Sequence, residues 1–345
     1  MRHRFLAALF IVTAVVLPVP PTATAQSAGS SALPRTPWGD PDLQGVWGNN
    51  SATPLQRPDA FAGKEVLTDE ELAELRRKAA QVLDGDDAFF GDDFVTAALS
   101  ENKQVRSFDT QTGNYNQFWL VERNFEKRTS LIVDPPNGKL PALTPEGQRR
   151  AAAEFQRVVG GRPPDGPEDL SLLVRCITFG LPNLFAGYNS YFQVLQAPGY
   201  VVMFHEMIHD TRIIPLDGRP HIAEHIRQWH GDSRGRWEGD TLVVETRNYS
   251  PETRLLIPGS GAGGDTLHVV ERFTRVGPNT MRWDVTFSDP TTWMQSWTAR
   301  MFVQKGENVI FEYACHEGNY AIAGILAGAR AEEQAAAGGA TTRSR

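Results

Sequence analysis

Short runs of alternating apolar and polar residues fill the second half of the chain. These runs are rich in β-branched and aromatic side chains and are separated by Gly, Pro, Asn or Asp, a pattern typical of β-strands. The predicted strands cover residues 191–196, 241–246, 267–276, 280–287, 292–303 and 309–314. Because consecutive strands joined by short turns pair with their neighbours, we predict an antiparallel meander that curls into a barrel-like or two-layer sheet.

The first half of the chain contains a helical pattern with its own start signal. Thr68 and Glu71 have the spacing of a capping box, and the apolar residues after them recur at helical spacing as far as Asp84. The residues on the predicted apolar face are Leu72, Leu75, Ala79, Val82 and Leu83. A helix from Thr68 to Asp84 follows from these two signals.

Other regular elements are predicted on both sides of this helix and at the end of the chain. A second helix runs from Thr144 to about Val159, with Pro145 at its first position, and the Ala-rich segment 321–337 is expected to be helical at first and frayed at its end. Further strands are predicted at 116–122 and 128–133, and a turn leads into a short strand near Trp47. The fold class is therefore mainly β, α+β overall, with a helical N-terminal portion and a C-terminal helix.

The first 25 residues have the three parts of a secretory signal. Arg2 and Arg4 form a basic front, Phe5–Leu17 is a short apolar run, and Ala23–Ala25 is a small-residue cleavage site. No later run approaches the ~20 apolar residues of a membrane span. We therefore expect an exported protein, periplasmic or extracellular, with no membrane insertion of the mature chain.

A segment rich in Gly and Pro at 160–169 is the predicted internal boundary. We expect an N-terminal arm and mixed α/β portion at 26–160, an antiparallel β domain at 161–330 and a disordered tail at 331–345. Five aspartates between residues 84 and 93 lack the spacing of a calcium-binding EF-hand loop, so a solvated acidic turn is expected there.

Charge and composition exclude some classes of partner. The chain of 345 residues is 41% hydrophobic and 22% charged and has a net charge of −7. It has no basic stripe for nucleic acid and no cationic helix for a membrane surface. A small-molecule substrate or ligand is the expected partner.

The chain has two cysteines, Cys176 and Cys315. In an exported protein an even pair predicts a disulfide, which would stabilise the fold by ~4 to 5 kcal/mol in the chain-entropy model. The alternative is a thiol nucleophile at Cys315, which precedes His316 and Glu317.

The segment from Tyr200 to Asp240 holds the residues best suited to chemistry. Five of the eight histidines fall within 26 consecutive residues and alternate with carboxylates. These residues are His205, His209, His221, His225 and His230, together with Glu206, Asp210, Glu224 and Asp232. Imidazole and carboxylate groups transfer protons near neutral pH and bind borderline metals such as zinc.

Two zinc-protease patterns occur in this segment. Residues 205–209 match HExxH, and residues 221–225 match the inverted HxxEH, so His205, His209, His221 and His225 are candidate ligands of a divalent metal. Both patterns require a helix. Residues 200–214 suit a strand at least as well, because they are rich in β-branched residues and end at Pro215.

Two further interpretations of the same residues stay open. In metal-free acid–base chemistry, Glu206, Asp210 or Glu224 acts as base or acid, His230 and Asp232 take part, and Arg212 holds an anionic or carbonyl group. In the other, the histidines are surface or hydrogen-bonded core residues.

Several segments of the second half resemble a group of exported proteins from soil bacteria that are usually labelled hypothetical. The resemblance rests on Arg175-Cys176 before a Gly-Leu-Pro turn, on IHDTRIIPLDGRPH, on HGDSRGRWEGDTLVVET and on the EYAC segment, within about Leu172–Ala329. It implies a shared fold and export, and it brings no activity with it.

These observations favour an exported enzyme with hydrolase or lyase chemistry on a small organic or carbohydrate substrate, metal-assisted or not. The alternatives are a lipocalin-like barrel that binds a small molecule without catalysis, a zinc hydrolase of the HExxH type, and a structural envelope protein.

Overall fold

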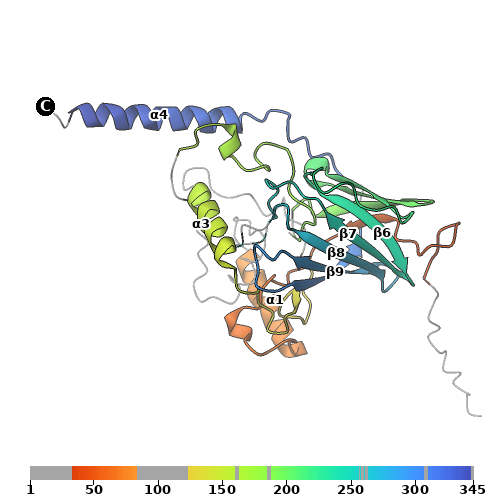
Figure 1. The fold of residues 1–345 in the computed structure, drawn as a ribbon. Helices are drawn as coiled ribbons and strands as arrows, with labels where there is room; N and C mark the ends of the chain where they lie inside the picture. Colours follow the sequence, from red (N-terminus) through yellow and green to blue (C-terminus); the bar gives the residue numbers. More distant parts are fainter. Residues whose placement is uncertain are drawn as a thin grey trace, which may run out of the picture. The chain divides into compact units, whose positions relative to one another are not determined.

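One large antiparallel sheet dominates the computed structural model, which describes residues 33–83, 123–159, 163–184, 188–255, 257, 260, 263–306 and 310–342. These residues belong to a single compact unit, Leu33–Arg345 (Figure 1). The predicted signal segment, the acidic turn at 84–93 and the strand at 116–122 lie outside the described residues.

Within the described residues, ten strands pair in the order β5-β4-β3-β1-β10-β9-β8-β7-β6, and β2 also pairs with β10. The strands are β1 (Gly45–Gly48), β2 (Ile132–Asp134), β3 (Tyr191–Ala197), β4 (Tyr200–His205), β5 (Thr211–Pro215), β6 (Asp232–Glu238), β7 (Thr241–Arg247), β8 (His268–Arg275), β9 (Thr280–Ser288) and β10 (Trp297–Lys305). The predicted antiparallel sheet is confirmed. Its centre is unexpected, because β1 from the N-terminal portion pairs with both β3 and β10.

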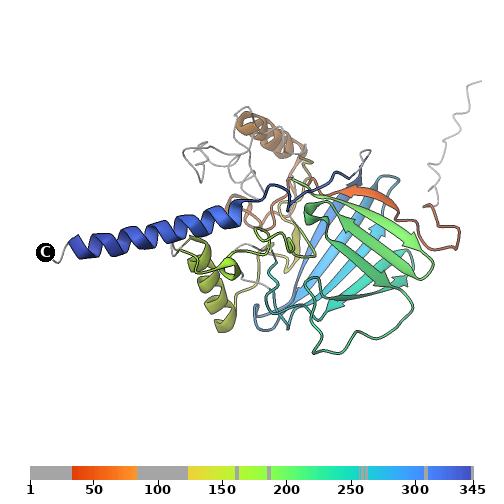
Figure 2. The ribbon, with the colours of Figure 1, turned by 90° about the horizontal axis from the view of Figure 1, so that it is seen from above.

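The sheet curls into a nearly closed barrel, as Figure 2 shows from above. Its two end strands, β5 and β6, lie next to each other. Gly235 on β6 makes this approach possible, because a Cβ atom there would lie 2.5 Å from Leu216 Cδ2 and 2.9 Å from Ile214 Cγ2. The seam between β5 and β6 therefore depends on a position without a side chain.

Alternate residues of each strand point into the barrel, where large side chains fill the space. On β8, β9 and β10 the buried positions recur at every second residue. The largest fully buried side chains include Trp47, Trp283, Trp293, Trp297, Tyr249, Phe273 and Phe287. An interior so occupied differs from the open calyx of a lipocalin-like binding barrel.

The two predicted internal helices form with their predicted start signals. Helix α1 (Asp69–Leu83) has a complete capping box, in which Thr68 N donates to Glu71 Oε2 (2.9 Å) and Glu71 N donates to Thr68 Oγ1 (3.2 Å). Helix α3 (Pro145–Val159) is capped by Thr144 Oγ1, which accepts from Gly147 N (3.0 Å). Short 3-10 turns lie at Asp59–Phe61 (η1), Pro167–Asp169 (η3) and Met207–His209 (η4).

The C-terminal helix is longer than predicted. Helix α4 runs from Ala321 to Thr342, so most of the segment expected to be a disordered tail from residue 331 is helical. Alanine has the highest intrinsic helix propensity, and this segment is rich in it. Within the described ranges, no helix combines the length and apolar character that crossing a membrane requires.

Three strand predictions differ from the structure. The strand predicted from residue 292 starts at Trp297, because Asp289 builds a turn in which its carboxylate accepts from Thr291 N (3.0 Å) and Thr266 Oγ1 (2.7 Å). The segment predicted at 128–133 contributes only the short β2, and the described residues of 309–314 form no strand. The boundary predicted near residue 160 does not divide the sheet, since β1 and β2, which precede it in the sequence, pair with strands that follow it.

We predict that Gly235→Ala destabilises the protein by ~1 to 3 kcal/mol, because the new methyl group forces β5 and β6 apart in a packed core. Urea unfolding measures the change. Gly277→Ala is the matched control, since its Cβ would come no closer than 3.8 Å to any neighbour. Equal effects of the two substitutions would contradict the role given to Gly235.

Candidate functional site

The HExxH segment forms a strand and a tight turn, not a helix. His205 ends β4, residues 207–209 form η4, and β5 begins at Thr211. Ile208 and His209 have positive φ values of 54° and 48°, which reverse the chain into a hairpin. His205 is buried in the barrel, whereas His209 is exposed and its Nδ1 lies 3.3 Å from the Tyr313 carbonyl oxygen. The zincin interpretation of this segment is therefore wrong.

The inverted motif at 221–225 lies on a loop. Glu224 and His225 are exposed there, and His221 Nδ1 pairs with Asp232 Oδ2 at 2.8 Å. In the part of the chain that the structure describes, no three His, Cys, Asp or Glu side chains are grouped so that they could hold a metal ion. His205, His209, His221 and His225 thus do not form the expected metal site.

The long histidine segment separates into groups that face different directions. Asp232 binds His221 and also accepts from Arg234 Nη1 (2.6 Å) on β6. Beside this pair, His268 Nε2 lies 3.0 Å from Glu245 Oε1, and partial burial together with the Arg247 guanidinium lowers the pKa of His268. This outer group lies on the solvent side of β6, β7 and β8.

A second group joins Asp210 to His230 at the end of β4 and β5. Asp210 is buried and accepts from Thr178 Oγ1 (2.8 Å) and Phe179 N (3.2 Å). His230 Nε2 lies 3.1 Å from Asp210 Oδ1 and 2.9 Å from Thr178 Oγ1. Since the Thr178 hydroxyl gives its hydrogen to Asp210, its oxygen accepts from His230. Nε2 of His230 therefore carries a hydrogen.

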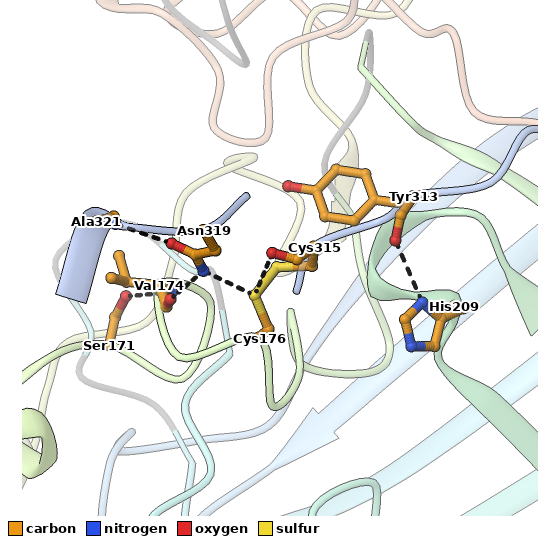
Figure 3. The surroundings of a disulfide bond; sticks show 8 residues. All are labelled: Ser171, Val174, Cys176, His209, Tyr313, Cys315, Asn319 and Ala321. Carbon is orange, nitrogen blue, oxygen red and sulfur yellow. Dashed lines mark hydrogen bonds between the residues drawn. A yellow bond between two sulfur atoms is a disulfide. The ribbon is translucent and has the colours of Figure 1, made fainter. Parts of the chain in front are cut away.

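Glu206 and His209 hold the segment that follows β10. Glu206 Oε1 accepts from Phe311 N (3.1 Å), and Figure 3 shows His209 directed at the Tyr313 carbonyl. Burial raises the pKa of Glu206, and the Phe311 hydrogen bond partly opposes this shift. The Glu206 carboxylate therefore has a structural role, since it binds the backbone of the segment that follows β10.

The disulfide predicted between Cys176 and Cys315 is present, with a Cα–Cα distance of 5.7 Å (Figure 3). Neither cysteine is free, so the thiol-nucleophile alternative is wrong. The disulfide connects the segment just before Thr178, which forms no strand, to the segment after β10 that Glu206 and His209 contact. It thus ties the segment that binds Asp210 through Thr178 to the segment that contacts Glu206 and His209.

A buried ion pair crosses the barrel interior close to His205. Arg212 on β5 binds Glu271 on β8 through both terminal nitrogens, and the two side chains are 3% and 0% exposed. Trp283 Nε1 also donates to Glu271 Oε1 (3.2 Å), and Arg212 Nη2 contacts Met203 Sδ (3.4 Å). Arg212 therefore neutralises Glu271, in place of the substrate anion or carbonyl that the sequence suggested.

His205 lies at one wall of a small pocket and is only 8% exposed. Its ring stacks on Phe192, with centroids 5.5 Å apart, and Trp283 lines the same pocket. The cavity volume is about 10 Å³, which is room for about one water molecule. His205 Nε2 is buried and has no hydrogen-bond partner among the described residues.

The environment of His205 keeps its ring neutral. Burial lowers its pKa well below the usual 6.5, and the positive charges of Arg212 and His230 lower it further. A neutral imidazole has one nitrogen free to accept a proton. His205 thus has the protonation state of a general base at neutral pH.

Comparison with known proteins brings no relative. No family model, curated protein or solved structure matches the chain. The geometry of the site therefore carries the functional argument.

We predict that Glu271→Gln destabilises the fold by ~3 to 5 kcal/mol, because it leaves the Arg212 charge buried without its counter-charge. Chemical unfolding provides the measurement. The double variant Arg212→Met/Glu271→Leu removes both charges and recovers most of this loss. Arg247→Met breaks the more exposed pair with Glu245 and costs at most ~1 kcal/mol. An equal loss in the single and double variants would contradict the proposed charge imbalance.

We also predict a pH dependence of stability that comes from His205. The unfolded chain protonates this residue near pH 6.5, whereas the folded protein resists protonation to a lower pH, so the unfolded state binds the extra proton. The free energy of unfolding therefore falls as pH decreases through and below this value. His205→Gln should show a smaller fall between about pH 7.5 and about pH 5.

The exposed His225→Gln variant is the control for this titration and should keep the wild-type pH dependence. The raised pKa of Glu206 acts in the opposite direction, because stability decreases as pH rises toward the folded-state value. Both variants retain Glu206, so this contribution cancels in the comparison. Parallel curves for wild type and His205→Gln would refute the prediction.

Proposed function

We propose that the protein is an exported hydrolase that uses acid–base chemistry at the barrel end where His205 and the Asp210–His230 pair lie. One observation carries the proposal: a neutral, buried histidine with an unpartnered Nε2 lines a water-sized pocket. Burying a polar atom without a hydrogen-bond partner costs free energy, and groups with shifted pKa values are common at functional sites. After burial and Arg212, His230 is the smallest of the three causes that lower the pKa of His205.

In the proposed reaction His205 is the general base and His230 the general acid. Water attacks the electrophilic carbon of a small organic substrate, and one of its protons passes to His205 Nε2. The bond to the leaving group breaks with its electron pair, and the leaving atom takes the Nδ1 proton of doubly protonated His230, which returns to its neutral form with its hydrogen on Nε2. Asp210 and Thr178 hold Nε2 of His230, so Nδ1 is the ring nitrogen that these two residues leave available for the proton transfer.

The alternative of a lipocalin-like binding barrel has less support from the packing. Its ligand would occupy the interior, where Trp47, Trp283 and Phe273 are all fully buried. The charged groups around the pocket also differ from a purely aromatic ligand cage, since Arg212 and Glu271 lie directly behind Trp283. Acid–base chemistry at the rim of a filled barrel accounts for both features.

We predict that His205→Gln lowers kcat by ~10² to 10⁴, the usual contribution of a general base. Because the substrate is unidentified, a panel of chromogenic esters, amides and glycosides first establishes which bond the wild-type protein hydrolyses. In wild-type protein kcat/KM should rise with pH through an apparent pKa below 6.5, since His205 must be neutral to accept a proton.

His225→Gln, on the exposed loop, serves as the control and should retain wild-type rates. Circular dichroism and thermal unfolding confirm that the variants are folded. The proposal is overturned if the wild-type protein hydrolyses no member of the panel, or if His205→Gln remains folded and fully active.

A further inference from the structure

Asn49 is a second buried polar residue at the His205 pocket, and it comes from a distant part of the chain. It follows β1 directly and lines the same pocket as His205. Its backbone N–H donates to Ser190 O (3.3 Å), which ties it to the residue before β3. The side chain is 2% exposed. A residue of the N-terminal portion thus forms part of a pocket otherwise built by the second half of the chain.

The orientation of the Asn49 amide is fixed by one hydrogen bond. Its Nδ2 donates to the Leu184 carbonyl (3.2 Å), so its Oδ1 faces the other way. Asn49 Oδ1 is buried and, like His205 Nε2, has no partner among the described residues. An unsatisfied buried acceptor costs ~1 to 3 kcal/mol, so two of them on one pocket indicate a missing donor.

We propose that this pocket binds one water molecule between His205 Nε2 and Asn49 Oδ1, and that this is the water consumed in the proposed hydrolysis. The use of this water in hydrolysis rests on the proposed function, whereas its binding does not. Asn49 Oδ1 accepts as a carbonyl oxygen, and His205 Nε2 accepts in the neutral tautomer that carries its hydrogen on Nδ1, the tautomer that a general base at Nε2 requires. A molecule that fills the pocket must therefore donate two hydrogen bonds.

Water satisfies this requirement in both size and chemistry. The pocket has room for about one water molecule, and each hydrogen of that water then meets one acceptor. Its oxygen keeps two lone pairs that are directed away from His205 and Asn49. When the water attacks, the hydrogen held by His205 passes to Nε2, and the hydrogen held by Asn49 stays on the new hydroxyl group.

Asn49 is accordingly a positioning residue for the nucleophile. It holds the water so that one lone pair points away from both acceptors, and His205 removes the proton. Asn49→Leu has nearly the same shape but lacks the acceptor, so the water loses one of its two anchors. We expect kcat to fall about tenfold with KM unchanged, the effect of one ordinary hydrogen bond made in the chemical step.

The test combines a high-resolution crystal structure of the full chain with kinetics of the variants. The wild-type pocket should contain one ordered water within hydrogen-bond distance of both His205 Nε2 and Asn49 Oδ1, and Asn49→Leu should lack it. Asn279→Leu is the control, because Asn279 is exposed, lies in the turn between β8 and β9 and does not line the pocket. It should keep both the water and the rate.

The outcomes separate this inference from the proposed function. A dry wild-type pocket, or a water that stays in place in Asn49→Leu, overturns the inference even if His205-dependent hydrolysis is present. A water that Asn49→Leu loses, in a protein that hydrolyses nothing, supports the water site and overturns the hydrolase. An unchanged kcat in a folded Asn49→Leu overturns the role in catalysis. Thermal unfolding of each variant shows whether it is folded.

Discussion

The close packing of the barrel interior is the constraint that the rest of the structure follows. Polar groups that enter such an interior must find partners, because desolvation is costly. Arg212 meets this requirement through Glu271, and Glu271 in turn accepts from Trp283. His205 meets it in another way, by staying neutral. Its unpartnered Nε2 lies at a pocket the size of one water, and the proposed chemistry is placed at this end of the barrel for that reason.

Features with local causes could be predicted from the sequence. The capping box of Thr68 and Glu71 needs only four consecutive residues, and Thr144 before Pro145 marks a helix start in the same way. Strand alternation gave β3, β7, β8 and β9 to within a few residues. The disulfide followed from cysteine count and predicted export. In each case the physical cause lies within the segment or in a simple count.

Features that depend on distant segments could not be predicted. The insertion of β1 between β3 and β10 leaves no local signal, although it brings Asn49 to the pocket. The seam between β5 and β6 depends on Gly235, where a Cβ atom would meet Ile214 and Leu216, which lie in a different segment of the sequence. The chain reversal at Ile208 and His209 could not be predicted, because a β-branched residue such as Ile208 favours extended backbone and rarely adopts a positive φ.

The histidines are close together in the sequence but dispersed in space, so among the described residues they are not grouped to hold a metal ion. On a helix, residues four apart share a face, but a hairpin turn between His205 and His209 leaves one inside the barrel and the other in solvent. Strand neighbours, and not sequence neighbours, then decide which groups meet. Asn49 lies 156 positions before His205 and reaches the same pocket because β1 pairs with β3, and β3 pairs with β4. In a barrel of this kind, residues that share a site therefore come from paired neighbouring strands rather than from one continuous segment of the sequence.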